Sequence, residues 1–349
     1  MARAIPTSQV GHQARRSRTY VNTGEIISLV SLPDFDPNNR PRVAISGDPS
    51  DSPLFNRAAQ GLYELGSTFK IFTAATSLEK GLANPQTIID TTPFKWNRKT
   101  YKDYKNYGPT NSVEDIIMKS SNVGTIRMAL AAGTTAQKKT LNDLGFFEAV
   151  PVELGEASRT KPQIPKNWSD TSTITISFGH GISATPLHLA TAYSIVANGG
   201  FRVKPTIKKV NSNNLAKEKV ISQKTSQQLI SMLRRVVSEF DGTAKMANVD
   251  GYQVAGKTGT AEKIKPTGGY YDKKVIATFA SFFPASNPKY TLVVSLDEPE
   301  IEVLGESRRT AGFTAVPVAA EIITRVAPIL NLRPIATDDA MAYTSISSQ

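Results

Sequence analysis

Ser67 and Lys70 form a pair whose residue types and spacing suit nucleophilic catalysis. Residues three positions apart share one face of a helix, so the Lys70 amine can reach the Ser67 hydroxyl. A lysine acts as a base there only when burial or neighbouring positive charge lowers its pKa. Gly66 precedes the pair, and a helix that begins at Ser67 would direct its first N–H groups toward an oxyanion. The segment therefore predicts a serine nucleophile with a lysine base.

Spacing alone does not single out this pair. The same Ser-x-x-Lys spacing occurs at Ser77–Lys80, Ser158–Lys161 and Ser286–Lys289. These three lie near a predicted helix end, in a polar loop and in a turn, where no helix is expected to begin. The sequence also lacks a Gly-x-Ser-x-Gly pentad, the mark of many Ser-His-Asp hydrolases, and contains only three histidines. A lysine base for Ser67 is therefore the stronger hypothesis.

Two further motifs follow along the chain. Ser120-Ser121-Asn122 interrupts a helical pattern, and Lys257-Thr258-Gly259-Thr260 lies on a predicted strand over 253–262. Each has an ordinary explanation, a helix–helix turn for the first and a β-bulge or edge residue for the second. Ser212-Asn213-Asn214 shows that Ser-x-Asn also arises by chance. In this order, however, the three motifs match the set of motifs found in penicillin-binding proteins. Class A β-lactamases have the same set, with Ser-Asp-Asn as the middle motif.

Composition excludes several other kinds of site. The 349 residues include no cysteine and three histidines, which excludes a disulfide scaffold, a thiol nucleophile and a Cys-ligated metal. A His-rich metal centre is also not expected. No apolar run approaches the roughly 18 residues of a membrane helix, so we expect a soluble chain.

The formal net charge is +11, and a basic run from Lys95 to Lys105 is interleaved with aromatic residues. We interpret this run as a solvated loop and expect no nucleic-acid partner, because no RNA- or DNA-binding signature accompanies it. Attraction to an acidic polymer or an anionic surface is the second possibility.

Hydrophobic periodicity predicts a mixed α+β chain. Two strands joined by a Gly-containing turn are expected over 20–30, and three more over 253–262, 275–283 and 290–296. Helices are expected between them, over 67–80, 112–119, 186–198 and 223–240, with a last one over 313–329. The simplest arrangement is one antiparallel sheet that both ends of the chain share. We expect residues 1–19 to be a disordered lead-in, 20–333 the domain, and 334–349 a frayed tail.

From about Gly24 to Ala320 the chain resembles the transpeptidase domain of class B penicillin-binding proteins, and most closely the division-specific peptidoglycan D,D-transpeptidases. Glu64, three residues before the serine, favours the division-specific group over the elongation group. The resemblance implies the penicillin-binding transpeptidase or serine β-lactamase-like fold, with a five-stranded antiparallel sheet, flanking helices and a helical subdomain. It rests on these segments: Thr23-Gly24-Glu25-Ile26, Phe55-Asn56-Arg57-Ala58, Tyr63-Glu64-Leu65-Gly66-Ser67-Thr68-Phe69-Lys70, Ser120-Ser121-Asn122-Val123-Gly124, Ser177-Phe178-Gly179-His180-Gly181 and Val254-Ala255-Gly256-Lys257-Thr258-Gly259-Thr260-Ala261.

The resemblance also implies a role for each motif residue. Ser67 would attack the D-Ala-D-Ala carbonyl of a stem peptide, with Lys70 as the base, and form an acyl-enzyme. Ser120, helped by Lys257, would relay a proton to the leaving nitrogen. Substrate binding is implied for Asn122 and for the strand residues Thr258, Gly259 and Thr260. The backbone N–H groups of Ser67 and Thr260 would form the oxyanion hole.

The implied partners are peptidoglycan stem peptides, β-lactam antibiotics and, for a full-length protein, divisome proteins and a glycan polymerase. No metal or organic cofactor is implied. The full-length protein would be anchored in the bacterial inner membrane with its catalytic domain in the periplasm. The membrane helix and pedestal domain of the family are missing from this sequence, from which we infer a truncated chain. His180 stands where the family often has Tyr. A loop residue that contacts substrate and a merely exposed histidine are the two alternatives, and we favour the exposed histidine.

Two rival functions use the same constellation. A serine β-lactamase or a D,D-carboxypeptidase would let water take the acyl group. A class A β-lactamase needs a Glu followed four residues later by Asn, but Glu153 is followed by Ala157 and Glu156 by Thr160. A non-catalytic β-lactam sensor would be acylated once and not released.

Overall fold

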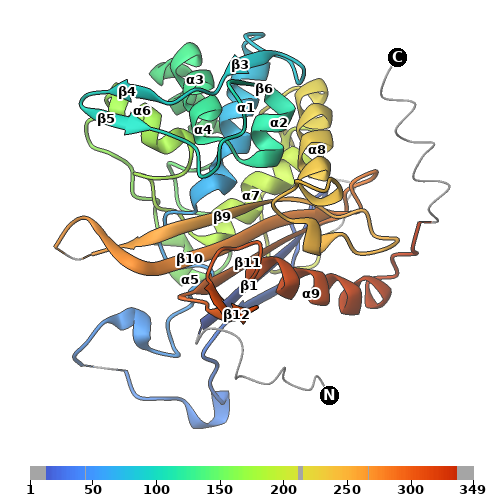
Figure 1. Cartoon of the computed structure of the whole chain (residues 1–349). Helices are drawn as coiled ribbons and strands as arrows, with labels where there is room; N and C mark the ends of the chain where they lie inside the picture. The colour runs from blue at the N-terminus through green and yellow to red at the C-terminus, as the bar shows by residue number, and fades with distance from the viewer. Residues whose placement is uncertain (1–12, 44, 211–214, 266, 336–349) are drawn as a thin grey trace.

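The computed structural model describes residues 13–43, 45–210, 215–265 and 267–335 (Figure 1). Its centre is a five-stranded antiparallel sheet in the order β2-β1-β11-β10-β9. The sheet is shared by both ends of the chain, as predicted, but its first strand ends at Tyr20, where the first predicted strand begins. The strands are β1 (Gln13–Tyr20), β2 (Ile26–Ser31), β9 (Ala255–Ile264), β10 (Tyr270–Phe283) and β11 (Tyr290–Asp297).

The prediction of a disordered lead-in over 1–19 is wrong for residues 13–19. These residues form most of β1, which pairs with β2 on one side and β11 on the other. Arg15, Arg16 and Arg18 break any apolar alternation, so the sequence carries no strand signal. Backbone pairing with two neighbouring strands decides the conformation instead. Residues 1–12 and 336–349, which cover the rest of the predicted lead-in and most of the predicted tail, lie outside the described residues.

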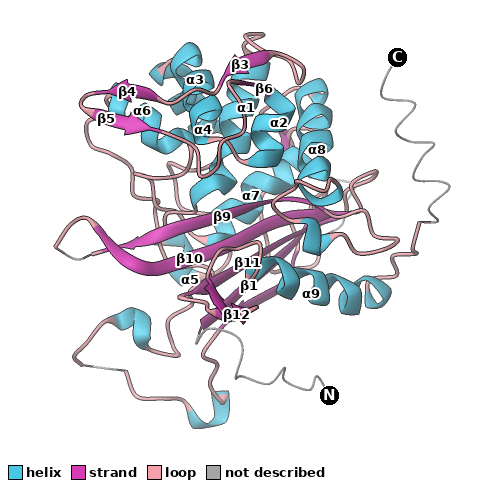
Figure 2. Cartoon of the chain, in the orientation of Figure 1, coloured by secondary structure: helices cyan, strands magenta, loops and turns pink. Residues whose placement is uncertain are grey.

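Helices cover both faces of the sheet (Figure 2). On one face lie α7 (Pro186–Ala197) and α8 (Gln223–Ser238), and α9 (Ala315–Ile329) packs on the other, against β10 and β11. Because both faces are covered, the last nine residues of β10 are buried without interruption. Each of the predicted helix starts at Ser112, Thr185 and near Gln223 is found, with Ser112, Thr185 and Ser222 as N-caps.

The helical subdomain lies above the sheet in Figure 1 and contains the remaining longer helices. These are α1 (Lys70–Glu79), α2 (Val113–Lys119), α3 (Asn122–Ala132), α4 (Thr134–Asp143) and α6 (Asp170–Ser177). The four-residue α5 (Gly155–Ser158) lies lower in Figure 1, where Ala157 belongs to a small apolar cluster with Leu187 of α7. Short two-stranded pairs decorate it and the neighbouring loops. They are β3 (Ile88–Asp90) with β6 (Thr110–Ser112), β4 (Phe94–Trp96) with β5 (Lys99–Tyr101), β7 (Phe201–Arg202) with β8 (Glu218–Lys219), and β12 (Ile301–Val303) with β13 (Glu306–Arg308).

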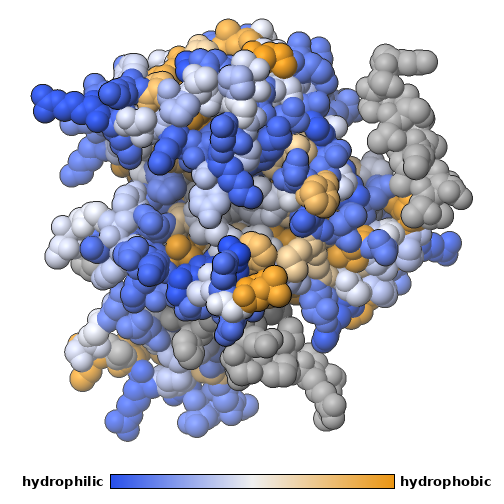
Figure 3. Space-filling model, viewed as in Figure 1, coloured by the Kyte–Doolittle hydropathy of each residue, from blue (hydrophilic) through white to orange (hydrophobic). Residues whose placement is uncertain are grey.

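The prediction of a solvated loop for the basic run is wrong for its first half, where β4 and β5 form a hairpin. Tyr101 is buried against Ile126 of α3 and Ile174 of α6, and its ring stacks on Phe94 at 5.7 Å. The lysines of the run remain exposed, and this part of the surface is mostly hydrophilic in Figure 3. Phe94, Trp96 and Tyr101 therefore anchor a hairpin on the subdomain, while Tyr104 is exposed.

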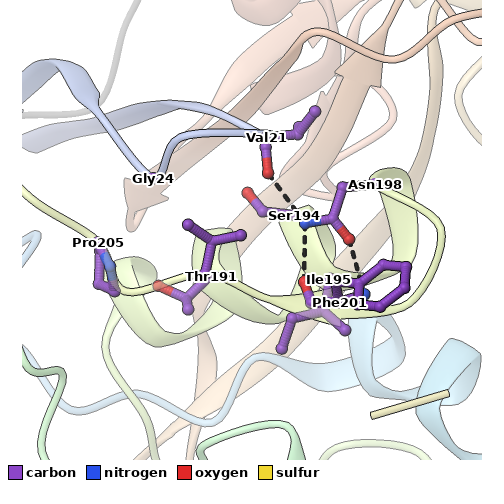
Figure 4. Close-up of a pocket in the computed structure, with 9 residues that line it drawn as sticks. Val21, Gly24, Thr191, Ser194, Ile195, Asn198, Phe201 and Pro205 are labelled. Carbon is purple, nitrogen blue, oxygen red and sulfur yellow. Dashed lines mark hydrogen bonds between the residues drawn. The ribbon is translucent and has the colours of Figure 1, made fainter. Parts of the chain in front are cut away.

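Side-chain bonds to backbone atoms join the parts of the fold. At the end of α7, Asn198 donates from Nδ2 to the carbonyls of Val21 and Phe201 and accepts the Phe201 N–H (Figure 4). The fully buried Tyr193 donates its hydroxyl to the Thr68 carbonyl at 2.9 Å. These bonds fix the turn before α1 relative to α7 and the sheet. None of the helices in the described parts of the chain is long and apolar enough to cross a membrane.

Candidate active site

Ser67 lies in a short 3-10 turn, Gly66–Phe69, that leads directly into α1. Lys70 is the first residue of α1, and its backbone N–H bonds to the Ser67 carbonyl. The predicted helix over 67–80 is therefore present, with a tighter first turn than expected. The 3-10 turn places Ser67 one helical turn before Lys70, the lysine of the Ser-x-x-Lys motif.

Three glycines let other backbone segments approach this turn. A Cβ at Gly259 of β9 would lie 2.2 Å from the Leu65 carbonyl oxygen, and one at Gly66 would lie 2.9 Å from the Thr260 carbonyl oxygen. On another side, a Cβ at Gly179 would lie 1.9 Å from the Gly66 carbonyl oxygen. The structure thus confirms that Gly259 marks a close approach, and it sets the backbone beside Ser67 against Thr260.

Ser120 links two buried lysines at the centre of the site. Lys70 Nζ lies 3.1 Å from Ser120 Oγ and 2.5 Å from the Ser120 carbonyl oxygen, and Lys257 Nζ lies 2.9 Å from Ser120 Oγ. Ser120 ends α2 in the left-handed conformation, with φ of +65°. That conformation is unfavourable for a residue with a Cβ, and here it presents both oxygens of Ser120 to Lys70.

Burial lowers the pKa of both lysines. Lys257 is fully buried, and desolvation lowers its pKa from 10.5 to about 7. Lys70 is also fully buried, and desolvation lowers its pKa well below 10.5, with a further contribution from the positive charge of Lys257 and an opposing one from Asp103. Two ammonium groups that share one hydroxyl repel each other, so a neutral lysine is accessible near pH 7. This meets the condition that the sequence set for a lysine base.

The residues predicted to bind substrate lie around this cluster. Asn122 is the first residue of α3, and Ser121 caps that helix by accepting the Gly124 N–H. Thr258 shares a hydrogen bond of 2.8 Å with Thr243 through their hydroxyls. Thr260 accepts the N–H of Ala311 on its Oγ1 at 3.0 Å. The motif residues therefore come from the 3-10 turn, the α2–α3 junction and β9, which the fold brings together.

Sequence reasoning missed Asp103, which follows the β4–β5 hairpin. Its carboxylate accepts hydrogen bonds from the Ser121 hydroxyl and from the N–H groups of Asn122 and Val123. A single acidic residue within a basic run was the only signal in the sequence, and it did not point to the Ser-x-Asn motif.

His180 is not an exposed histidine, so that prediction is wrong. Its ring packs between Phe178, with centroids 5.3 Å apart, and Tyr270, with centroids 6.0 Å apart. Burial lowers its pKa to about 4, which leaves the ring neutral at pH 7. Nearby, the buried Glu64 accepts the Gly181 N–H at 2.6 Å and the Tyr270 hydroxyl at 3.2 Å, and burial raises its pKa. Glu64 thus holds the loop that backs Gly66.

The two glutamates considered for a lactamase role are engaged elsewhere. Glu153 accepts hydrogen bonds from the Thr206 hydroxyl and the Ile207 N–H, and Glu156 accepts one from the Asn56 amide. In the described parts of the chain, no group of three or more His, Asp or Glu side chains is placed to hold a metal ion.

The model of the penicillin binding protein transpeptidase domain family matches residues 20–324 of this sequence. The chain belongs to this family. The match covers all three motifs and the strands β2, β9, β10 and β11, so the resemblance predicted from the motifs is confirmed, together with the fold class that it implied.

Curated proteins that are similar to this chain carry names consistent with this family. The chain is 34% identical over 323 residues to a probable peptidoglycan D,D-transpeptidase FtsI of Caulobacter vibrioides, covering 90% of this chain and 54% of the relative. It is 32% identical over 315 residues to the peptidoglycan D,D-transpeptidase FtsI of Escherichia coli K12, covering 90% of this chain and 51% of the relative. The chain thus spans about half the length of the curated relatives that it matches.

Solved structures of similar proteins share the fold. The apo transpeptidase domain of penicillin-binding protein 3 from Burkholderia pseudomallei is 29% identical, with a TM-score of 0.80 over 93% of this chain and 91% of that one. Penicillin-binding protein 3 from Mycobacterium tuberculosis, complexed with ampicillin, is 28% identical, with a TM-score of 0.80 over 94% of this chain and 74% of that one.

Proposed function

We propose that this chain is the catalytic part of a peptidoglycan D,D-transpeptidase that cross-links stem peptides through an acyl-enzyme on Ser67. The observation that carries the proposal is the hydrogen-bonded chain of Lys70, Ser120 and Lys257, with both lysines buried beside the 3-10 turn that contains Ser67. The names of the relatives support the same reaction class.

In the first half-reaction, Ser67 Oγ attacks the carbonyl carbon of the D-Ala-D-Ala bond while the neutral Lys70 amine takes the hydroxyl proton. The backbone N–H groups of Ser67 and Thr260 stabilise the oxyanion. The tetrahedral intermediate then breaks its C–N bond, and the leaving D-Ala amine takes a proton from Ser120. Ser120 recovers that proton from a neighbouring lysine. The product is an ester between Ser67 and the shortened stem.

In the second half-reaction, a neutral amine of another stem attacks the ester carbonyl and gives up a proton to the neutral Lys70 amine. The ester C–O bond then breaks, and Lys70 returns that proton to Ser67 Oγ. Asn122 would bind the amide of the acyl chain. The Thr258 and Thr260 hydroxyls, with Gly259 between them, would hold the terminal carboxylate of the donor, with Lys257 as its charge partner. These roles extend the geometry of the site to a bound substrate.

For the full-length protein we propose an inner-membrane anchor with this domain in the periplasm, and contacts with divisome proteins and a glycan polymerase. These contacts rest on the family resemblance. β-Lactams, which resemble D-Ala-D-Ala, are expected to acylate Ser67 and so to report on the site without a natural substrate.

The test is intact-protein mass spectrometry after incubation with benzylpenicillin, on the native chain and on Ser67→Ala. A single long-lived adduct on the native chain, absent from Ser67→Ala, is the expected result. Rapid drug hydrolysis without an adduct would instead indicate a β-lactamase. A donor and acceptor peptide pair then separates the remaining cases: cross-linked product supports a transpeptidase, hydrolysis alone a carboxypeptidase, and neither a β-lactam sensor.

A further inference from the structure

We propose that Asp103 is a positioning residue, whose carboxylate holds the start of α3 and thereby fixes Ser120 and Asn122 relative to Lys70. The proposal rests on the proposed function, because it assigns Asp103 a part in acylation. Asp103 Oδ2 accepts from Ser121 Oγ at 2.6 Å, and Oδ1 accepts from the N–H groups of Asn122 at 2.5 Å and Val123 at 3.0 Å.

These bonds complete the N-terminus of α3. The first N–H groups of a helix have no partner within the helix, and a carboxylate is the favoured acceptor for them. Asp103 takes those of Asn122 and Val123, while Ser121 Oγ takes that of Gly124 at 3.0 Å. Ser121 therefore accepts from its own helix and donates to Asp103, which locks its rotamer. The α2–α3 junction is held from both sides.

The carboxylate itself is held by the hairpin that precedes it. Asp103 comes two residues after the buried Tyr101, whose ring packs with Ile126 and Ile174. Phe94 of the opposite strand stacks on Tyr101, and Arg127 of α3 lies over the Phe94 ring at 5.1 Å. The hairpin thus grips the middle of α3 while Asp103 holds its first residues.

A single residue, Ser120, links this junction to Lys70. Ser120 precedes Ser121 directly, and its strained left-handed backbone aims its carbonyl oxygen and Oγ at Lys70 Nζ. A residue in that conformation relaxes unless its surroundings hold it. Release of α3 by loss of Asp103 would let Ser120 turn away from both lysines and let Asn122 shift with it.

The same carboxylate acts on the charge of the site, in support of this geometry. Asp103 opposes the effects that lower the pKa of Lys70. Lys102 and Lys105, its neighbours on the hairpin segment, are exposed. We therefore expect the carboxylate to favour a site that keeps one lysine charged beside Ser120.

The experiment compares Asp103→Ala and Asp103→Asn with a matched control, Asp90→Ala. Asp90 is also a carboxylate of this subdomain with three bonds, to the N–H and hydroxyl of Thr92 and to Arg127 of α3, but it does not touch the start of that helix. Stopped-flow acylation by a chromogenic β-lactam separates the non-covalent dissociation constant from the acylation rate constant.

The expected result is an acylation rate constant lower by about tenfold or more in Asp103→Ala, with the control within about twofold of the native chain. Asp103→Asn, which keeps one acceptor oxygen, is expected between them and serves as the test if the alanine variant folds poorly. Native rates in both Asp103 variants, or an equal loss in Asp90→Ala, would overturn the proposal.

Amide hydrogen exchange gives a second readout that needs no activity. Asp103→Ala should accelerate exchange at Asn122 and Val123 by about tenfold, and Asp90→Ala should not. Unchanged exchange at these two amides would show that Asp103 does not hold α3, whatever the rates. If the native chain itself is not acylated, the proposed function fails, and the exchange data alone decide whether Asp103 anchors the helix.

Discussion

The loop that contains Gly179 packs against the 3-10 turn that contains Ser67. Replacing Gly179 with alanine is the sharpest test of whether this contact positions Ser67. Gly179 has φ of +86°, and an added Cβ would lie 1.9 Å from the backbone oxygen of Gly66. Reaching ordinary contact at 3.4 Å requires a displacement of about 1.5 Å. Neither partner is a side chain that can rotate away, so the segment beside Ser67 must move.

Gly181→Ala is the matched control in the same loop. Gly181 also has a positive φ, of +77°, but its Cβ would come closer than ordinary contact only to the Thr175 hydroxyl, at 3.1 Å, which is a side-chain atom and can shift. Both substitutions pay about 1–2 kcal/mol for the left-handed backbone. Only Gly179→Ala adds the clash, so the difference between the two variants isolates it. Both variants keep the Gly181 N–H that Glu64 accepts.

The assay is the acylation rate with a fluorescent penicillin, together with urea unfolding. A displacement of about 1 Å at reacting groups costs about 100-fold in rate, so we expect Gly179→Ala to acylate about 100-fold more slowly than Gly181→Ala. It should also be less stable than the control by about 2 kcal/mol or more. Equal rates in the two variants would refute the conclusion that this loop positions Ser67.

Two further predictions concern buried polar groups. Tyr193→Phe should lower the free energy of unfolding by about 1–3 kcal/mol in urea titrations, because the buried Thr68 carbonyl loses its donor; no change would show that water replaces it. The second concerns Lys257. Burial lowers its pKa from 10.5 to about 7, so between these pH values the unfolded chain binds more protons than the folded one. Stability should therefore rise with pH above 7, by at most about 1.4 kcal/mol per pH unit from this group, and Lys257→Met should flatten the rise between pH 7 and 9; parallel curves would contradict the lowered pKa.

The motif residues were readable from the sequence because local patterns encode them. Ser67 and Lys70 are joined by helical spacing, Ser121 is a helix cap, and Gly259 interrupts a predicted strand. The early and late strands were also visible where residues alternate or cluster as strands require. Spacing of this kind survives without knowledge of the rest of the fold.

The errors share a physical cause. β1 is rich in arginine and carries no apolar alternation. In the β4–β5 hairpin the alternation Phe94-Lys95-Trp96 spans only three residues, which is too short to stand out within a basic run. Pairing with distant strands decides the first, and packing of Tyr101 on α3 and α6 decides the second. Likewise, nothing near His180 in the sequence announces Tyr270, which covers its ring from a residue 90 positions away.

The sequence by itself therefore determined which side chains are proposed to do the chemistry, the order in which they occur and the family to which the chain belongs, since these depend on residue type and short spacing. The tertiary structure decided the pKa values and the hydrogen-bond partners of those side chains. Lys70 and Lys257 become candidates for bases and proton donors near neutral pH only because the fold buries them on either side of Ser120. Asp103 joins the site because a hairpin carries it to a helix start that lies 19 residues further along the chain. Desolvation and long-range hydrogen bonds depend on the packed molecule, and no local pattern contains them.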